Sequence, residues 1–314
     1  MLGWSSIVRR RVLPALAGLG HRQVDVASRT GQVALADGVD GRVFRTYETA
    51  LDVSEAELVY VSTRNHEHAA LAAAALETGR HVVIDKPATL ACLETRGLAD
   101  LAAARGRLVA EATVWPWHPQ IDEARRILAE SGPATRLVAA FSFPRLAEDN
   151  FRLRAGGGGV LWDLGPYAVS MGRVFFGAAP EEIVAVAQTR HGDEVETAFT
   201  AFMRYPGDRV AIGHFGMTTA YINRLDVLGP QAAITLERAF TTPPDRPCHV
   251  TGEQAGTRIA LDAPAADAFA RFLGDVIAAA ATGRHQPFAD AMLTDAAVLD
   301  RLRAAALDPA GGPR

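Results

Sequence analysis

Lysine is nearly absent from this sequence. The chain has 314 residues and 32 lysines and arginines together, but only one of these is a lysine, Lys86. Many surface positions accept either lysine or arginine, whereas a catalytic position often accepts only one of them. The reason is that arginine stays protonated, while burial can lower the pKa of lysine. A lone lysine can arise by chance from a biased nucleotide composition. The alternative is a chemical task, and the residues around Lys86 bear on that choice.

Cysteine is also scarce. Cys92 and Cys248 lie far apart in the sequence and belong to no CxxC motif or Cys/His cluster. Isolated cysteines of this kind are typical of buried thiols rather than of a disulfide or of zinc ligands. We therefore expect no metal site, and we expect the protein to work in the reducing cytoplasm.

Long apolar runs and a strong net charge are missing as well. No apolar run reaches the ~20 residues that span a bilayer, and the first six residues do not form a secretory signal. A formal net charge of −4 argues against nucleic acid as the main partner. What remains is a small-molecule partner, and a local group of arginines would suffice to bind an anionic one.

The first third of the chain alternates short β-branched runs with helical stretches. Residues 24–27, 58–61 and 81–84 are predicted strands, and residues 67–78 form a predicted helix that stops at Gly79. This alternation is typical of a parallel, doubly wound sheet. The prediction is an α/β fold with a Rossmann-like dinucleotide-binding domain at residues 1–113.

The remainder, residues 114–314, has a different pattern. Apolar runs separated by Gly, Pro and Asp turns predict strands at residues 137–143, 183–188, 197–205, 209–215 and 225–228. Consecutive strands without intervening helices indicate a mostly antiparallel, open-faced sheet. The prediction is an α+β domain for substrate binding and self-association. Because a sheet with one uncovered face often pairs with a copy of itself, we expect a homo-oligomer, a dimer or a tetramer.

The N-terminal segment occupies the place of the glycine-rich turn of a dinucleotide domain. Gly3 permits a tight turn, Ser5 and Ser6 keep the side chains small, and a helix from about Ile7 would direct N–H groups at a pyrophosphate. An ordinary helix N-cap gives the same pattern. Only two apolar residues precede the turn, so either the recorded start lies a few residues too late or this edge of the pocket is thin.

The end of the second predicted strand bears on cofactor choice. An NAD site usually has an acid here to hold the ribose 2′-hydroxyl, whereas this chain has Ser28 and Arg29. A hydroxyl beside a guanidinium suits a 2′-phosphate, which points to NADP(H). A solvated loop arginine is the alternative.

Lys86 follows directly on a predicted buried strand, in the sequence Ile-Asp-Lys-Pro at residues 84–87. Open α/β sheets bind ligands at the carboxyl ends of their strands. The proline disfavours helical geometry at Lys86 and makes a cis bond possible. The only lysine therefore lies where this fold performs its chemistry, and we interpret it as catalytic.

A second candidate segment has four glycines, residues 156–159, ahead of a predicted helix. The glycines would let the backbone approach a ligand closely. Asp163 and Tyr167 are spaced i, i+4, so they would share one helical face and reach a common substrate. A flexible hinge followed by an amphipathic helix, with Tyr167 in the core, is the alternative.

These motifs resemble the glucose–fructose oxidoreductase/inositol dehydrogenase family (Gfo/Idh/MocA) over nearly the whole chain. The resemblance rests on Asn65 and His68, on residues 79–82 leading to the Asp-Lys-Pro motif, and on residues 157–167. Two departures are Asp85, where the family usually has glutamate, and Tyr167, where many members have histidine.

Within that family, Tyr167 and three further segments resemble the sugar-nucleotide 3-ketoreductases of deoxysugar biosynthesis. The segments are residues 215–217, Tyr221 with Asn223, and residues 240–244. The resemblance implies that NADPH reduces the C3 ketone of a dTDP-linked 3,4-diketo-2,6-dideoxyhexose. It implies catalytic roles for Lys86, Tyr167 and Asp163, with either Lys86 or Tyr167 giving the proton.

The resemblance also implies binding residues. The substrate would contact Tyr167, Tyr221 and Thr242. The cofactor would contact Gly3, Trp4, Ser5, Ser6, Ile7, Arg9, Arg10, Ser28, Arg29, Tyr47, Thr63, His68, Lys86, Arg152 and Asp163. Two other functions stay open: a dehydrogenase of a free sugar or inositol, and a non-catalytic sensor of NADP(H). The sequence leaves the exact sugar and the stereochemistry undecided.

Overall fold

The computed structural model describes residues 1–35 and 38–307, and the chain forms two compact units. The first unit comprises Met1–Thr113 and Phe269–Ala296. The second comprises Val114–Ala268 and the described residues from Ala297 onward.

The segment Phe269–Ala296 lies with the first unit, whereas the predicted division assigns it to the second domain. Packing explains the difference. Met292 is buried in the core of the first unit, and the Arg11 guanidinium lies 5.1 Å from the ring centre of Phe269. The apolar stripe of this helical segment is therefore buried by residues from the beginning of the chain.

The first unit contains a parallel sheet. Its strands are β1 (Val26–Ala27), β2 (Val43–Phe44), β3 (Leu58–Val61), β4 (His81–Ile84) and β5 (Val109–Glu111). The pairs β1–β2, β3–β4 and β4–β5 are all parallel. Leu2 joins the two groups of strands, because it bridges Ala27 on one side and Val61 on the other. The predicted doubly wound parallel sheet is confirmed, with Leu2 standing where the first strand belongs.

Helices connect these strands. The described helical segments of this unit are η1 (Val8–Val12), α1 (Leu13–Gly18), α2 (Tyr47–Val53), η2 (Asn65–Glu67), α3 (His68–Glu77), α4 (Cys92–Ala104), α8 (Ala268–Thr282) and the first part of α9 (Gln286–Leu307). Gly79 follows α3 with a φ of 78°, a left-handed conformation that favours glycine. Because this glycine ends α3, the chain enters β4 at His81 and reaches Lys86 two residues after that strand ends.

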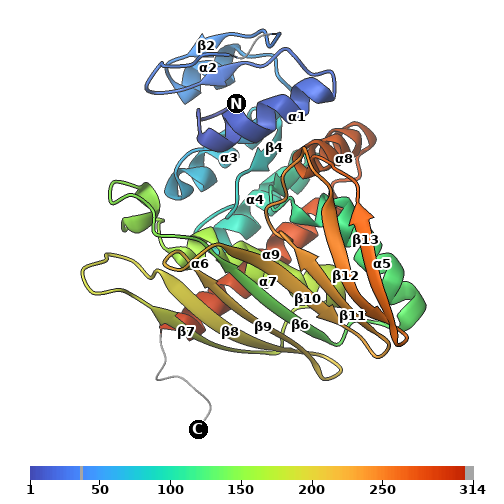
Figure 1. Cartoon of the computed structure of the whole chain (residues 1–314). Helices are drawn as coiled ribbons and strands as arrows, with labels where there is room; N and C mark the ends of the chain where they lie inside the picture. Colours follow the sequence, from blue (N-terminus) through green and yellow to red (C-terminus); the bar gives the residue numbers. More distant parts are fainter. Residues whose placement is uncertain (36–37, 308–314) are drawn as a thin grey trace. The chain divides into compact units, whose positions relative to one another are not determined.

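The second unit is built on an eight-stranded sheet, shown in Figure 1. Its strands are β6 (Arg136–Ser142), β7 (Glu182–Gln188), β8 (Ala198–Tyr205), β9 (Arg209–Gly216), β10 (Ile222–Leu228), β11 (Ala232–Glu237), β12 (Cys248–Gln254) and β13 (Thr257–Ala263). They lie in the order β13-β12-β11-β10-β6-β9-β8-β7, and every pair is antiparallel except β6–β9. The predicted mostly antiparallel sheet is confirmed.

Helices cover one face of this sheet. The described helices in the first half of the unit are η3 (Trp115–Trp117), α5 (Pro119–Ser131), η4 (Phe151–Leu153), α6 (Val160–Asp163) and α7 (Gly165–Phe176). Helix α5 packs across β11 to β13, and α6 and α7 pack against β8 and β9 (Figure 1). Burial alternates along β6, where Leu137 and Ala139 are buried and Val138 is exposed. The other face of the sheet is therefore open. Among the helices described, none is long and apolar enough to cross a membrane.

Candidate active site

The turn after Leu2 brings the chain close to the end of β3. Gly3 has a φ of 103°, and a Cβ at this position would lie 2.1 Å from the carbonyl oxygen of Ser62. Only glycine fits such an approach. The Ser5 hydroxyl accepts a hydrogen bond of 3.0 Å from the Val8 N–H and so caps the helical segment that follows. A turn is present at the predicted place, with Trp4 in it, Ser6 and Ile7 at the start of the helix that follows, and Arg9 and Arg10 exposed on that helix.

Three predicted cofactor residues lie together at the end of β1. Arg29 lies over the Tyr47 ring at 5.5 Å, and the Ser28 hydroxyl is 3.1 Å from that of Thr30. Arg29 has a further partner in Glu67, which comes from a distant segment and forms an ion pair of 2.6 Å with it. The spacing between the two residues in the sequence gave no signal of this pair.

These groups fit the phosphorylated adenosine end of NADP(H). Residues 28–31 carry hydroxyl and guanidinium groups and no carboxylate, and the Arg45 guanidinium lies beside Gly31. Arginine binds phosphate through charge-assisted hydrogen bonds, whereas an NAD site usually presents an acid here. The donor set therefore favours a 2′-phosphate over a 2′-hydroxyl.

Lys86 lies just beyond the carboxyl end of β4, is half-buried, and is joined to Pro87 by a cis peptide bond. Its neighbour Asp85 accepts one hydrogen bond from the Tyr60 hydroxyl at 2.5 Å and a second from Ser62. Desolvation raises the pKa of Asp85, while these two hydrogen bonds and the charges of His68 and Lys86 oppose the rise. Burial and the adjacent Asp85 raise the pKa of Tyr60 well above its usual value.

Two further side chains fix the loop that follows Lys86. His68 is buried, and its Nδ1 lies 2.9 Å from the Pro87 carbonyl oxygen, so Nδ1 is the atom that carries the proton. Glu111 accepts a hydrogen bond of 2.8 Å from the Ala88 N–H, and a second from Thr113. His68 was predicted to bind the cofactor, whereas its observed contact is with the lysine loop. Thr63, also predicted, directly follows Ser62 and is partly exposed.

The second unit holds Asp163 and Tyr167. Asp163 is the last residue of α6 and forms an ion pair of 3.2 Å with Arg152, so two predicted cofactor residues are together. Tyr167 belongs to α7, and Leu164 interrupts the helical structure between α6 and α7. The two residues therefore do not share one continuous helix, as the i, i+4 spacing had predicted. Pro166, at the first turn of α7, explains why a new helix begins there.

Tyr167 packs among aromatic rings rather than standing alone. Its ring centre lies 5.4 Å from that of Phe141 and 5.5 Å from that of Phe240. These contacts hold the ring in place, and Tyr167 as a whole is partly exposed.

The glycines before α6 are explained in part by the chain's own packing. A Cβ on Gly158 would lie 2.2 Å from the Arg154 carbonyl oxygen, and one on Gly159 would lie 2.4 Å from the Glu196 carboxylate. These two positions therefore need glycine whether or not a ligand binds. A close approach to a ligand and a flexible hinge were the two interpretations of the four glycines, and for these two positions the structure supplies a third reason.

Of the two residues predicted to contact substrate, Tyr221 belongs to a hydrogen-bonded group with Asn223 and Thr241, and Thr242 is bonded to Gln120. Asn223 donates to Thr241 at 2.7 Å and to the Tyr221 hydroxyl at 3.3 Å, and it accepts the Phe240 N–H at 3.0 Å. Gln120 donates to Thr242 at 3.4 Å. Asn223 thus connects the start of β10 to the segment that carries Thr242, a role that its residue type alone did not indicate.

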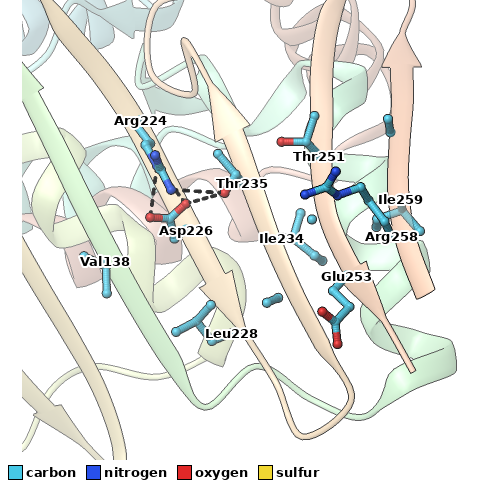
Figure 2. Close-up of a pocket in the computed structure, with 13 residues that line it drawn as sticks. Val138, Arg224, Asp226, Leu228, Ile234, Thr235, Thr251, Glu253, Arg258 and Ile259 are labelled. Carbon is cyan, nitrogen blue, oxygen red and sulfur yellow. Dashed lines mark hydrogen bonds and ion pairs between the residues drawn. The ribbon is translucent and has the colours of Figure 1, made fainter. Parts of the chain in front are cut away.

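A separate hollow of about 740 Å³ lies on the open face of the sheet, over β10 to β13 (Figure 2). Three of its polar side chains bind one another: Arg224 pairs with Asp226 at 2.9 Å, and Thr235 donates to Asp226 at 2.6 Å. None of the residues that line the hollow is a predicted site residue. The hollow is therefore distinct from the groups of predicted site residues described above.

Comparison with known proteins assigns the chain to a family. Residues 10–113 match the model of the oxidoreductase family with an NAD-binding Rossmann fold, and residues 121–235 match the GFO/IDH/MocA C-terminal domain. An uncharacterised oxidoreductase of Rhizobium meliloti, ORF334, is 30% identical over 270 residues, which are 84% of this chain and 80% of that protein. The chain belongs to the Gfo/Idh/MocA family.

Two relatives of this Gfo/Idh/MocA oxidoreductase have named activities. A dTDP-3,4-didehydro-2,6-dideoxy-alpha-D-glucose 3-reductase of Streptomyces violaceoruber is 31% identical over 250 residues, 77% of this chain and 72% of that protein. The crystal structure of KijD10, a 3-ketoreductase from Actinomadura kijaniata in complex with NADP and TDP-benzene, is 28% identical with a TM-score of 0.90, and the match covers 97% of this chain and 96% of that one. The resemblance inferred from the motifs is confirmed.

Proposed function

We propose that this Gfo/Idh/MocA protein uses NADPH to reduce a keto group, at C3, of a nucleotide-linked deoxyhexose in the cytoplasm. The observation that carries the proposal is the position of Lys86. The chain's only lysine follows β4 in a loop that Asp85, His68 and Glu111 hold by hydrogen bonds. The named activities of the two relatives support the choice of substrate.

NADPH would be held by the turn at Gly3 to Ser6 and, at its 2′-phosphate, by Ser28 and Arg29. When bound, it supplies the hydride that reduces the carbonyl carbon. The protein must then stabilise the negative charge on the carbonyl oxygen and deliver one proton to it, so that the ketone becomes an alcohol. The ammonium group of Lys86 can perform both tasks. The Tyr167 phenol is the second candidate donor.

Substitutions separate these roles. Lys86→Ala is expected to lower kcat by about 10²–10⁴-fold with little change in the dissociation constant of NADPH. Lys86→Arg should fail as well, because a guanidinium retains its proton. Arg96→Ala removes an exposed cation of the same unit and serves as the control with unchanged kcat. Near-normal turnover by Lys86→Ala, together with its loss in Tyr167→Phe, would assign the proton to Tyr167.

A substrate panel tests the function itself. Consumption of NADPH would be followed with keto-sugar nucleotides, and oxidation of free sugars and inositol would be followed with NADP⁺. Turnover of the keto-sugar nucleotides alone supports the proposal. Turnover of free polyols would replace it with a sugar dehydrogenase, and tight NADPH binding without turnover of any substrate would indicate a sensor.

We also propose that the protein is a homo-oligomer that associates through the open face of the eight-stranded sheet. This face exposes apolar side chains from neighbouring strands, Val184 and Val186 on β7, Phe202 on β8 and Ile212 on β9. Contiguous exposed apolar groups are typical of association surfaces. Sedimentation should show a dimer or tetramer that Ile212→Asp dissociates, and a monomeric wild type would refute this part of the proposal.

A further inference from the structure

We infer that Asp85 is a positioning residue whose carboxylate imposes one direction on a chain of hydrogen bonds between the nucleotide turn and the lysine loop. The inference rests on the proposed function for its kinetic consequence. This chain of hydrogen bonds is formed within the first unit, by Val8, Ser5, Ser62 and Asp85. It joins the turn expected to hold the pyrophosphate to the residue before the catalytic lysine.

The direction follows from the number of protons that each group has. When Asp85 is ionised its carboxylate only accepts, so the Ser62 hydroxyl then gives its single proton to Asp85. Ser62 then has only lone pairs to offer to Ser5, whose oxygen lies 2.7 Å away, and Ser5 must be the donor in that contact. The Ser5 oxygen, in turn, accepts the Val8 N–H. Every hydrogen bond in the chain therefore points toward Asp85.

Because its residues are closely packed, the hydrogen-bond chain restrains both the Gly3 turn and Asp85. Ser62 and Tyr60 are buried, and the Gly3 turn lies directly against the Ser62 carbonyl. Tyr60 occupies the second carboxylate oxygen, so Asp85 cannot rotate to release Ser62 without losing Tyr60. A change at residue 85 is thus transmitted to the turn through groups that have no other arrangement available.

Two consequences follow for the reaction. The Ser5 proton is committed to Ser62, so the turn offers backbone N–H groups rather than this hydroxyl to a phosphate. The Asp85 charge also acts on the next residue, since Asp85 and Lys86 interact electrostatically, and the other charged or polar groups that act on Asp85 are Tyr60, Ser62 and His68. Asp85 therefore favours the ammonium form of Lys86 while it holds the turn.

Asp85→Asn is the informative substitution because asparagine keeps the shape of the side chain and changes the direction of the hydrogen bonds that end at residue 85. One carboxylate oxygen becomes an NH₂ group, which faces a hydroxyl that had been donating. If that hydroxyl belongs to Ser62, the chain must reverse, and if it belongs to Tyr60, the phenol loses its acceptor. Either outcome removes a charge-assisted hydrogen bond, which corresponds to about a tenfold change in an equilibrium constant.

The experiment is a double-mutant cycle on the dissociation constant of NADPH, measured by fluorescence titration without substrate. Asp85→Asn and Ser5→Ala should each weaken binding, Asp85→Asn by about tenfold. The double variant should be no weaker than the stronger single variant, because the chain is already broken. Ser54→Ala removes a hydroxyl outside the chain and should combine additively with Asp85→Asn.

A second readout separates charge from shape. Without the Asp85 charge, the alkaline limb of the kcat–pH profile should move to lower pH, whereas Ser62→Ala should break the chain without moving that limb. If the Asp85→Asn variant does not fold, Ser62→Ala replaces it in the double-mutant cycle with Ser5→Ala. Additive effects of Ser5→Ala with both Asp85→Asn and Ser62→Ala would overturn the inference. Absence of turnover in the wild type would instead refute the proposed function and leave the binding cycle valid.

Discussion

Glu67→Gln is expected to tighten NADPH binding while leaving NADH binding unchanged. Glu67 forms an ion pair of 2.6 Å with Arg29, the guanidinium that we expect to hold the 2′-phosphate. A bound 2′-phosphate would share Arg29 with this carboxylate, and two anions on one cation repel each other. Removing the charge of Glu67 therefore favours the cofactor that brings a second anion, and has no such effect on the cofactor that lacks one.

The structure sets the size of this effect. Charges at opposite edges of a guanidinium are about 6 Å apart, where two unit charges repel by about 0.7 kcal/mol in water and about 3 kcal/mol at an effective dielectric constant of 20. Arg29 is 59% exposed, which favours the lower end of this range. A value of about 1 kcal/mol corresponds to about fivefold in the dissociation constant.

The substitution leaves the local fold in place. Glu67 also accepts the Arg64 N–H at 3.2 Å as part of a capping box, and the glutamine amide oxygen can accept the same hydrogen bond. Glu77→Gln, at the exposed far end of α3, is the matched control, since it removes the same charge about 15 Å away along the helix.

Fluorescence titration with NADPH and NADH would measure both dissociation constants, at low and at high salt. The gain for NADPH should shrink at high salt, because salt screens repulsion between charges that solvent reaches, and the Arg29 side chain between them is 59% exposed. Weaker NADPH binding by Glu67→Gln would refute the reasoning. It would mean that Glu67 acts chiefly by orienting Arg29, so that the cofactor loses more from a displaced guanidinium than it gains from reduced repulsion.

Three further predictions concern binding and stability. Arg29→Ala should weaken NADPH binding about tenfold or more relative to NADH, measured by the same titrations, because charge-assisted hydrogen bonds to phosphate are lost. Gly172→Ala should destabilise the protein by about 1–3 kcal/mol in thermal unfolding, since a Cβ there would lie 2.2 Å from the Tyr205 ring. Burial and the nearby Arg107 lower the pKa of His81 in the folded state. The unfolded chain therefore binds more protons below about pH 6.5, and the free energy of unfolding should fall as the pH drops through that value, less so in His81→Gln.

The fold was predictable because its signals are local. The strand before Lys86, the glycine after α3 and the run of strands beyond residue 113 all depend on patterns within about ten residues. The break between Asp163 and Tyr167 also had a local signal, since Pro166 favours the start of a new helix. The i, i+4 spacing was given precedence over that signal, and the predicted shared helix was wrong.

The contacts that hold the site residues in place were not predictable in the same way. Glu67 meets Arg29, and Ser5 meets Ser62, only because the parallel sheet brings distant segments together. Alternation along β3 places Tyr60 and Ser62 on one face, but nothing in the sequence indicates that Asp85 lies opposite them. The segment Phe269–Ala296 likewise returns to the first unit because of apolar packing that a local helical pattern cannot reveal.

The solitary Lys86 has a practical consequence. Reagents that acylate primary amines have one side chain to modify in this chain, and that side chain is half-buried at the end of β4. A mass increment on the peptide that contains Lys86 would therefore record the occupancy of this position directly, separately from any increment on the N-terminal peptide. Its protection by a nicotinamide nucleotide or by a sugar nucleotide would map each ligand onto the lysine without radiolabel, coupled enzyme or crystal.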